Sequence, residues 1–402
     1  MPTVPTAQKA REMIEAVHRY GLKVPRTIVF GKNRLNELGD LAFPLAAGKK
    51  ALILLGGGSA RRAGLDQRIV TLLGRHGVAA EILNGIHGEP TVDIVDSLAG
   101  KARALQPGLV VSAGGGSVMD TGKAVAALAV NEGLVEEYLE GETQARALAA
   151  APIPHIAIPT VAGTGAEMTR NAVIGHPGKK VKRSMRADSM IPTVALIDSM
   201  LTLSVPHDVT ASGGMDALTQ LIESCISNRR RPETTALAQE GLRLAREAVA
   251  ISAEAPGNEA ARDKMSLVSM LGGVCLANAG LAMAHGIAAA LGALFGVPHG
   301  LACGILLPYT LRYNAPACSA ELAHALSAFL NQGGMAPRII EEGIAAVEAL
   351  ADSIGIPPDL KEMALTEEDV QEIARRSIGT SMSGNPIPMN PDQIAEFLRP
   401  LV

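Results

Sequence analysis

The sequence contains very few aromatic residues: five Phe, four Tyr and no Trp among 402 residues. It therefore lacks the aromatic side chains on which nucleic-acid bases stack. Neither sign of charge is in large excess, because 36 Lys and Arg nearly balance 40 Asp and Glu and leave a net charge of −4. We therefore expect neither a nucleic acid nor an anionic membrane as a partner. The one basic cluster, residues 178–186 (GKKVKRSMR), is interpreted as a solvated loop.

Cysteine is scarce as well, and no secretory signal is visible. The four cysteines show no CxxC or CxxxC spacing, which gives no sign of a metal-binding or redox pair. Three of them have small apolar neighbours, so reduced, buried thiols are predicted. Residues 1–21 lack the apolar stretch of a signal peptide, and we expect a cytoplasmic protein.

One long stretch has almost no charge. Residues 271–308 are long enough to span a bilayer, but they are rich in Gly and Ala and are interrupted at Gly296 and Pro298. Membrane-spanning segments are usually flanked by Lys/Arg clusters or by Tyr/Trp anchors, and neither flanks this stretch. We predict two closely packed buried helices and no membrane span.

Short runs of β-forming residues alternate with helical patterns in the first half of the chain. Alternation of this kind is typical of a mainly parallel sheet covered by helices. The predicted strands are residues 26–31, 50–58, 79–85, 108–116, 155–160 and 193–198, and one of the helices between them covers residues 91–106.

After about residue 200 the strand patterns stop and long helical patterns follow. They include residues 232–253, residues 337–355 and a last helix with Asn390 as its cap and Pro391 in its first position. The sequence thus predicts an α/β dinucleotide-binding domain with a Rossmann-like sheet over residues 1–200. An all-α domain for metal and substrate follows over residues 201–402.

Two glycine-rich loops follow predicted strands. Residues 114–117 (GGGS) lead from a strand into a helix, where glycines permit close approach and free N–H groups suit a diphosphate; a tight structural turn is the alternative. In residues 56–59 (also GGGS), Gly57, Gly58 and Ser59 stand where NAD-binding folds usually carry a carboxylate. Arg61 and Arg62 come next, which favours the 2′-phosphate of NADP over NAD.

Polar residues of a kind that bind metals occur in the helical half. Asp216 and Gln220 are four residues apart and share one helix face, and His285 and His299 lie fourteen residues apart in an apolar stretch. Buried histidine needs partners for its ring nitrogens. These residues are candidates for a metal site, although a satisfied core histidine and a carboxylate at a helix start remain alternatives.

Four motifs in this order and spacing resemble the iron-containing (group III) alcohol dehydrogenases. They are GGGSVMDTGKA, PTVAGTGAEMTRNAVI, GGMDALTQLIE and AHGIAAALGALFGVPHG, and the resemblance runs from about Arg26 to the NPIPMNPDQI tail. It implies a reversible transfer of hydride between NAD(P)(H) and a small alcohol or aldehyde, and it implies a homodimer.

The resemblance also implies roles for individual residues. The family's diphosphate loop falls on Gly115, Gly116 and Ser117, and a position near the nicotinamide and substrate falls on Asn171. A GGGS at residues 56–59 is similar to that of NADPH-dependent aldehyde reductases in the family. Further cofactor positions fall on Asp120, Thr160, Thr164 and Lys182.

The family's metal ligands, an Asp and three His, are matched by Asp216, His285 and His299, but Gln220 stands at the second position. Ala289 replaces a further histidine linked to proton transfer. Gln220 can supply a neutral oxygen ligand for Fe²⁺ or Zn²⁺. Alternatively, Asp216, His285 and His299 alone hold the metal and leave the fourth position open, as in a catalytic zinc site. A metal-free reductase of an oxo acid and a silent NADP-binding subunit are the alternative functions.

Overall fold

The computed structural model describes residues 5–56, 59–86, 88–141 and 144–402 of the chain. The chain divides into two compact units. The first comprises Met1–Val161 and Gly165–Val205, and the second comprises Ala162–Thr164 and Pro206–Val402.

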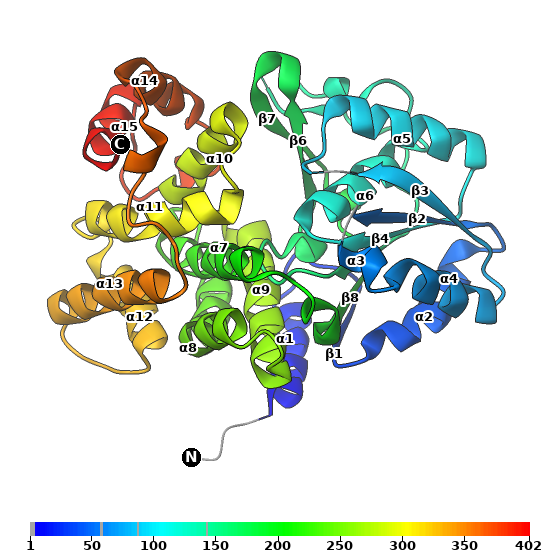
Figure 1. Ribbon diagram of the computed structural model, residues 1–402, viewed down its shortest axis with the longest axis horizontal. Helices are drawn as coiled ribbons and strands as arrows, with labels where there is room; N and C mark the ends of the chain where they lie inside the picture. Colours follow the sequence, from blue (N-terminus) through cyan, green and yellow to red (C-terminus); the bar gives the residue numbers. More distant parts are fainter. Residues whose placement is uncertain (1–4, 57–58, 87, 142–143) are drawn as a thin grey trace. The chain divides into compact units, whose positions relative to one another are not determined.

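A parallel sheet of six strands forms the centre of the first unit (Figure 1), in the order β1-β8-β5-β4-β2-β3. Each strand pairs in parallel with its neighbours; for example, Ile53 of β2 lies beside Val111 of β4. The strands are β1 (Thr27–Gly31), β2 (Ala51–Gly56), β3 (Ala80–Ile86), β4 (Leu109–Gly114), β5 (His155–Pro159) and β8 (Val194–Asp198). All six were expected from the β-forming runs, and the predicted Rossmann-like sheet is confirmed.

Helices cover both faces of this sheet (Figure 1), because alternate strand residues point to opposite sides. Ile53 and Leu55 of β2 share a hydrophobic core with α2 and α4. Leu52 and Leu54 share a second core with α5 and α6 on the other face. The helices of this unit are α1 (Thr6–Arg19), α2 (Leu38–Ala46), α3 (Ser59–Arg62), α4 (Leu65–Arg75), α5 (Val92–Leu105) and α6 (Gly116–Leu128).

A second, two-stranded sheet corrects one prediction. The basic segment 178–186 is not a loop: its residues Val181–Arg186 form strand β7, which pairs in antiparallel fashion with β6 (Asn171–His176). Met185 of β7 and Ile174 of β6 are buried in a core with residues of α5 and α6. The alternation of this hairpin was missed because basic side chains occupy its less buried positions.

The second unit is helical. Its helix α7 (His207–Ile226) packs against α8, α9 and α11, and Asn390 caps the last helix with Pro391 in its first position, as predicted. The other helices are α8 (Pro232–Glu254), α9 (Glu259–Ala279), α10 (Met283–Phe295), α11 (His299–Asn314), α12 (Ser319–Leu330), α13 (Ala336–Ser353), α14 (Glu367–Arg376) and α15 (Pro391–Leu398).

The stretch with almost no charge contributes to three helices and not to the predicted two. The chain breaks at Gly296, as predicted, and also at Gly280, whose φ of +68° is one that glycine adopts readily. Within the described residues, no single helix is long and apolar enough to cross a membrane. Helices α9 and α10 together pass that test by length and composition only, and they are bent by 101° at their junction.

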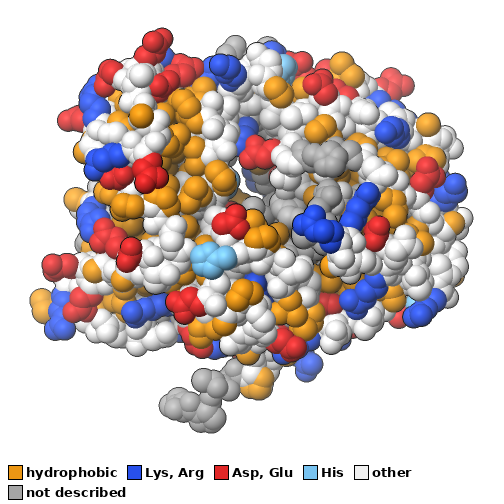
Figure 2. Space-filling view, in the orientation of Figure 1, with side chains coloured by type: hydrophobic (Ala, Val, Ile, Leu, Met, Phe, Trp, Pro, Cys, Tyr) orange, Lys and Arg blue, Asp and Glu red, His pale blue; other side chains and the backbone are white. Residues whose placement is uncertain are grey.

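Acidic and basic side chains are interspersed over each unit on the face drawn in Figure 2. This distribution agrees with the near balance of charges in the sequence.

Two glycines inside helices of the first unit provide a matched test of its packing. A Cβ on exposed Gly100 of α5 would meet no atom within 4 Å. A Cβ on buried Gly122 of α6 would lie 2.7 Å from Cβ of Ser112 and 2.8 Å from Nε2 of His155. These two side chains are hydrogen-bonded to each other at 2.7 Å, so neither is free to move away.

We expect Gly122→Ala to lower the free energy of unfolding by about 1–3 kcal/mol because it overpacks this contact. Gly100→Ala should raise it by roughly 0.5–1 kcal/mol, since alanine is the better helix former. Denaturant unfolding followed by circular dichroism measures both. Equal stabilisation by the two substitutions would contradict the packing described.

Candidate functional site

Four side chains with metal-binding atoms meet inside the second unit. They are Asp216 of α7, His285 of α10, and His299 and Cys303 of α11, and one ligand atom from each lies within 4.8 Å of all the others. Asp216, His285 and Cys303 are buried, and His299 is partly buried. Three residues predicted from the sequence are thus brought together, and Cys303 joins them.

Close helix packing makes this cluster possible. Gly300 lies in the first turn of α11, beside α7, and a Cβ there would lie 2.2 Å from the backbone oxygen of Ser212 and 3.2 Å from Cβ of Asp216. Only glycine permits this approach of the two helices. His299 at the start of α11 and Asp216 on α7 are consequently near enough to bind the same metal ion.

Glu223 holds the ring of His285 in place. Its carboxylate accepts hydrogen bonds from the backbone N–H groups of Ala282 (2.9 Å) and Ala284 (2.7 Å), and it lies 2.7 Å from Nδ1 of His285. The other ring nitrogen, Nε2, lies 3.1 Å from Oδ1 of Asp216. A carboxylate behind a histidine fixes the tautomer and the ring orientation of a metal ligand.

The electrostatics of the cluster favour the metal-binding forms of Asp216 and Cys303, whereas His285 has to lose a proton before it can bind a metal. Burial lowers the pKa of His285, but the charge of Cys303 and the hydrogen bonds to Asp216 and Glu223 outweigh it, so this pKa is held well above its usual value. Burial raises the pKa of Asp216 and of the Cys303 thiol, and the imidazoles of His285 and His299 more than reverse both effects. Asp216 and Cys303 therefore tend toward the deprotonated forms that bind metals.

Gln220 turns its amide nitrogen toward the cluster. Nε2 donates to Oδ1 of Asp216 (3.2 Å) and to the backbone oxygen of Thr164 (3.1 Å). Its oxygen Oε1 is buried without a hydrogen-bond partner and lies 2.6 Å from where a Cβ on Gly272 of α9 would be. Ala289, one turn after His285 on α10, is exposed.

The predicted diphosphate loop lies where β4 meets α6. Gly115 precedes the first helical residue, Gly116, and Ser117 follows in the same turn. A Cβ on Gly114 would lie 2.5 Å from Cγ2 of Val118, so the helix begins directly against the strand. The N–H groups of this first turn have no partner within the helix and suit an anion.

A buried lysine connects this helix to the strand that begins at Asn171. Nζ of Lys123 lies 2.8 Å from Oδ1 of Asp120, 2.8 Å from Oγ1 of Thr169 and 2.6 Å from the backbone oxygen of Asn171. Asp120 also accepts from the backbone N–H of Val173 at 2.9 Å. Asp120 thus positions β6 against α6.

The remaining predicted cofactor residues are more dispersed. The backbone N–H of Thr160, after β5, donates to the backbone oxygen of Gly114 (2.9 Å). Lys182 of β7 forms an ion pair with Glu89 (2.5 Å). Thr164 belongs to the second unit, where its carbonyl accepts from Gln220.

Part of the predicted NADP loop, Gly57 and Gly58, lies outside the described residues. Ser59 begins α3, which follows the carboxyl end of β2. In the same helix Arg61 donates through Nη2 to Oδ1 of Asn84 on β3, while its Nε is buried without a partner.

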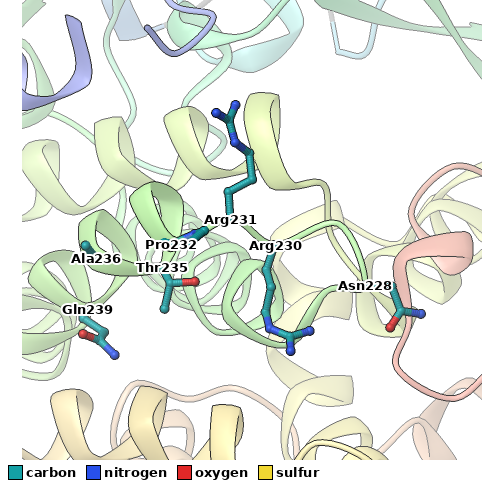
Figure 3. Close-up of a pocket in the computed structure, with 7 residues that line it drawn as sticks. All are labelled: Asn228, Arg230, Arg231, Pro232, Thr235, Ala236 and Gln239. Atoms are coloured by element: carbon teal, nitrogen blue, oxygen red, sulfur yellow. The ribbon is translucent and has the colours of Figure 1, made fainter. Parts of the chain in front are cut away.

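A cavity of about 520 Å³ lies at the start of α8, apart from the donor cluster (Figure 3). Arg230 and Arg231 point in opposite directions from the loop before this helix. None of the residues predicted above as metal or cofactor ligands lines this cavity. Its lining consists of Asn228, Arg230, Arg231, Pro232, Thr235, Ala236 and Gln239.

The chain thus combines a parallel sheet of the dinucleotide-binding type in one unit with an Asp/His/His/Cys cluster in a helical unit. Residues 25–199 match the family model for iron-containing alcohol dehydrogenase, and residues 210–402 match its C-terminal model. The chain belongs to the iron-containing alcohol dehydrogenase family and is an oxidoreductase. The resemblance predicted from the four motifs is confirmed.

Relatives cover nearly the whole chain. An NADPH-dependent butanol dehydrogenase of Clostridium saccharobutylicum is 30% identical over 384 residues, 93% of this chain and 96% of that protein. A 1,3-propanediol dehydrogenase of Klebsiella pneumoniae is 33% identical over 387 residues, 94% and 97% of the two chains. The crystal structure of a 1,3-propanediol oxidoreductase superposes with a TM-score of 0.88 at 31% identity and covers 94% and 98%.

Sequence reasoning missed two residues of the site, Glu223 and Cys303. Both could have been found from their helical spacing to residues already predicted. Glu223 follows Asp216 by seven residues and Gln220 by three, and Cys303 follows His299 by four, so each shares a helix face with a residue already singled out.

The role of Glu223 is tested by Glu223→Gln. The amide replaces one of the two oxygens by an NH2 group, which then faces the backbone N–H of either Ala282 or Ala284 and leaves that donor without an acceptor, so we expect a loss of about 1–3 kcal/mol in the free energy of unfolding. Glu247→Gln, at an exposed ion pair with Lys264, is the control and should change it by less than about 1 kcal/mol. Denaturant unfolding of both variants checks this, and equal effects would contradict the role of Glu223.

Proposed function

We propose that the protein transfers hydride reversibly between NADP(H) and a small alcohol or aldehyde whose oxygen is activated by a divalent metal. The observation that carries the proposal is the meeting of Asp216, His285 and His299, with ligand atoms within 4.8 Å of one another, in a member of this family. Two atoms that bind one ion through bonds of about 2.0–2.3 Å can stand no farther apart than about 4–4.6 Å, and Nε2 of His285 lies 3.1 Å from Oδ1 of Asp216. The donors present therefore fit one ion.

The metal residues and their supports have separate tasks. Asp216, His285 and His299 would hold the ion, which supplies a Lewis acid for the substrate oxygen when bound. Glu223, 2.7 Å from Nδ1 of His285, would keep a proton on that nitrogen and leave Nε2 free to bind the ion. Ala289 offers no proton-transfer group, so we infer that the alcohol proton leaves through water or the cofactor ribose.

The cofactor would lie at the carboxyl end of the parallel sheet. The N–H groups of Gly115, Gly116 and Ser117 suit its diphosphate, and Thr160, Thr164 and Lys182 are further contacts expected from the family. Asn171 would adjoin the nicotinamide, which carries the hydride chemistry itself. Lys123 holds the backbone of Asn171 and so positions it.

The preference for NADP rests on the residues after β2. Ser59, Arg61 and Arg62 stand where a ribose-binding carboxylate is expected for NAD. The buried, unpartnered Nε of Arg61 is an unused donor at this place. The relative from Clostridium saccharobutylicum, whose name includes NADPH dependence, is in line with this preference.

Metal dependence is tested by metal content and activity together. In protein purified without chelator or immobilised metal, we expect close to one Fe²⁺ or Zn²⁺ per chain, and a loss of both metal and aldehyde reduction in His285→Ala and His299→Ala. His324→Ala, an exposed histidine of α12, is the control and should retain both. Metal-free protein that reduces aldehydes with NADPH would overturn the metal role, and tight NADPH binding without turnover would indicate a silent subunit.

Cofactor choice is tested by the ratio of kcat/KM with NADPH to that with NADH. Removing a charged hydrogen bond of roughly 1.5–3 kcal/mol corresponds to about a 10- to 100-fold change, so Arg61→Ala and Arg62→Ala should lower this ratio by that factor. Arg75→Ala, at the end of α4, is the control and should leave the ratio unchanged. A ratio that stays constant in all three variants would contradict the assignment of the 2′-phosphate site.

A further inference from the structure

The fourth donor of the cluster is not the residue that its position in the family motif suggests. We infer that the thiolate of Cys303, and not the amide of Gln220, completes the metal site, which makes it an Asp/His/His/Cys centre suited to Zn²⁺. This inference rests on the metal role proposed above. It concerns which atoms of this chain bind the ion.

Two spacings between donor atoms lie near those around a tetrahedral ion. Two ligands with bonds of about 2.0–2.3 Å at tetrahedral angles stand about 3.3–3.8 Å apart. Sγ of Cys303 lies 3.8 Å from Nε2 of His299, and Nε2 of His285 lies 3.1 Å from Oδ1 of Asp216. The rings of His285 and His299 face the same space, with centroids 5.3 Å apart.

Cys303 is held in this position by its helix. It follows His299 by one turn of α11, so both side chains lie on one face of the helix. The thiol is fully buried. Among the described residues, Cys225, Cys275 and Cys318 belong to no such group of ligands.

Gln220 is a poor candidate because of the atoms around it. Its nitrogen faces two acceptors, Oδ1 of Asp216 and the backbone oxygen of Thr164. Exchanging the amide nitrogen and oxygen would place Oε1 against both of these oxygens, which is unfavourable since neither carries a proton to donate. The amide oxygen therefore faces Gly272 of α9 and not the cluster.

A thiolate ligand changes the metal preference of the site. Sulfur is a soft donor that favours Zn²⁺, which takes Cys, His and carboxylate ligands in tetrahedral geometry, whereas an amide oxygen is a weak, neutral ligand. The charges of Asp216 and Cys303 together balance a divalent ion. A substrate oxygen would then enter as a fifth ligand, as zinc sites permit.

Cobalt provides a direct test, because Co²⁺ replaces Zn²⁺ and a thiolate ligand produces an intense near-ultraviolet charge-transfer band. The full-length protein is stripped with chelator and titrated with Co²⁺. We expect one Co²⁺ per chain and a charge-transfer band in the wild type. The band should vanish in Cys303→Ser, which should also bind Zn²⁺ at least about tenfold more weakly.

Two control variants isolate the ligand. Cys318→Ser replaces a thiol that donates to the backbone oxygen of Asn314 by a hydroxyl that can donate in its place, and this variant should retain the band. Gln220→Ala should retain both the band and the Co²⁺ stoichiometry. A loss of Co²⁺ affinity in Gln220→Ala with no charge-transfer band in the wild type would identify the amide as the ligand.

The outcomes separate the two proposals. Co²⁺ bound by the wild type without a charge-transfer band, a measurement that requires no variant to fold, would overturn the role of Cys303 and leave the metal role intact. Failure of the wild type to bind Co²⁺ or Zn²⁺, together with intact NADPH-dependent reduction, would overturn the metal role and with it the assignment of Cys303.

Discussion

The bonds that converge on the buried carboxylate of Glu223 decide where the metal donors lie. They fix the first turn of α10 to α7 through Ala282, Ala284 and His285. An uncompensated carboxylate in this position would be costly, so the chain supplies donors for both of its oxygens. The position of His285 is therefore set before any ion is present, which is the preorganisation that a catalytic metal site needs.

Glycines at the contacts between helices are as important to the site as the donor side chains. Gly300 brings the start of α11 against α7, and Gly272 leaves room for the oxygen of Gln220 beside α9. A cluster of four donors from three helices requires these backbones to approach more closely than ordinary side chains allow. The small residues that make the stretch 271–308 resemble a membrane segment in composition thus also meet the packing needs of a buried polar site.

The strands of the main sheet and the family could be predicted from the sequence, because continuous β-forming runs and four spaced motifs each carry a local signal. The β6–β7 hairpin could not be predicted, because the consecutive basic residues Lys182 and Arg183 interrupt the alternation of polar and apolar side chains that marks a strand. Cys303 could be found only from its spacing to His299, and its meeting with Asp216 depends on tertiary packing. The direction of the Gln220 amide likewise depends on Thr164, which is distant in sequence.

His155, which lies against Gly122 and Ser112 under α6, gives the first unit a sensitivity to acid. Burial, aided by the charge of Lys123, lowers the pKa of this histidine to about 3. Since an exposed histidine in the unfolded chain titrates near its ordinary pKa of about 6.5, the unfolded state takes up the extra proton as the pH falls. The free energy of unfolding then declines by up to about 1.4 kcal/mol per pH unit between these two pKa values. The helix α6, which begins at the predicted diphosphate loop, thus packs on a histidine whose burial favours the folded state at neutral pH over acidic pH.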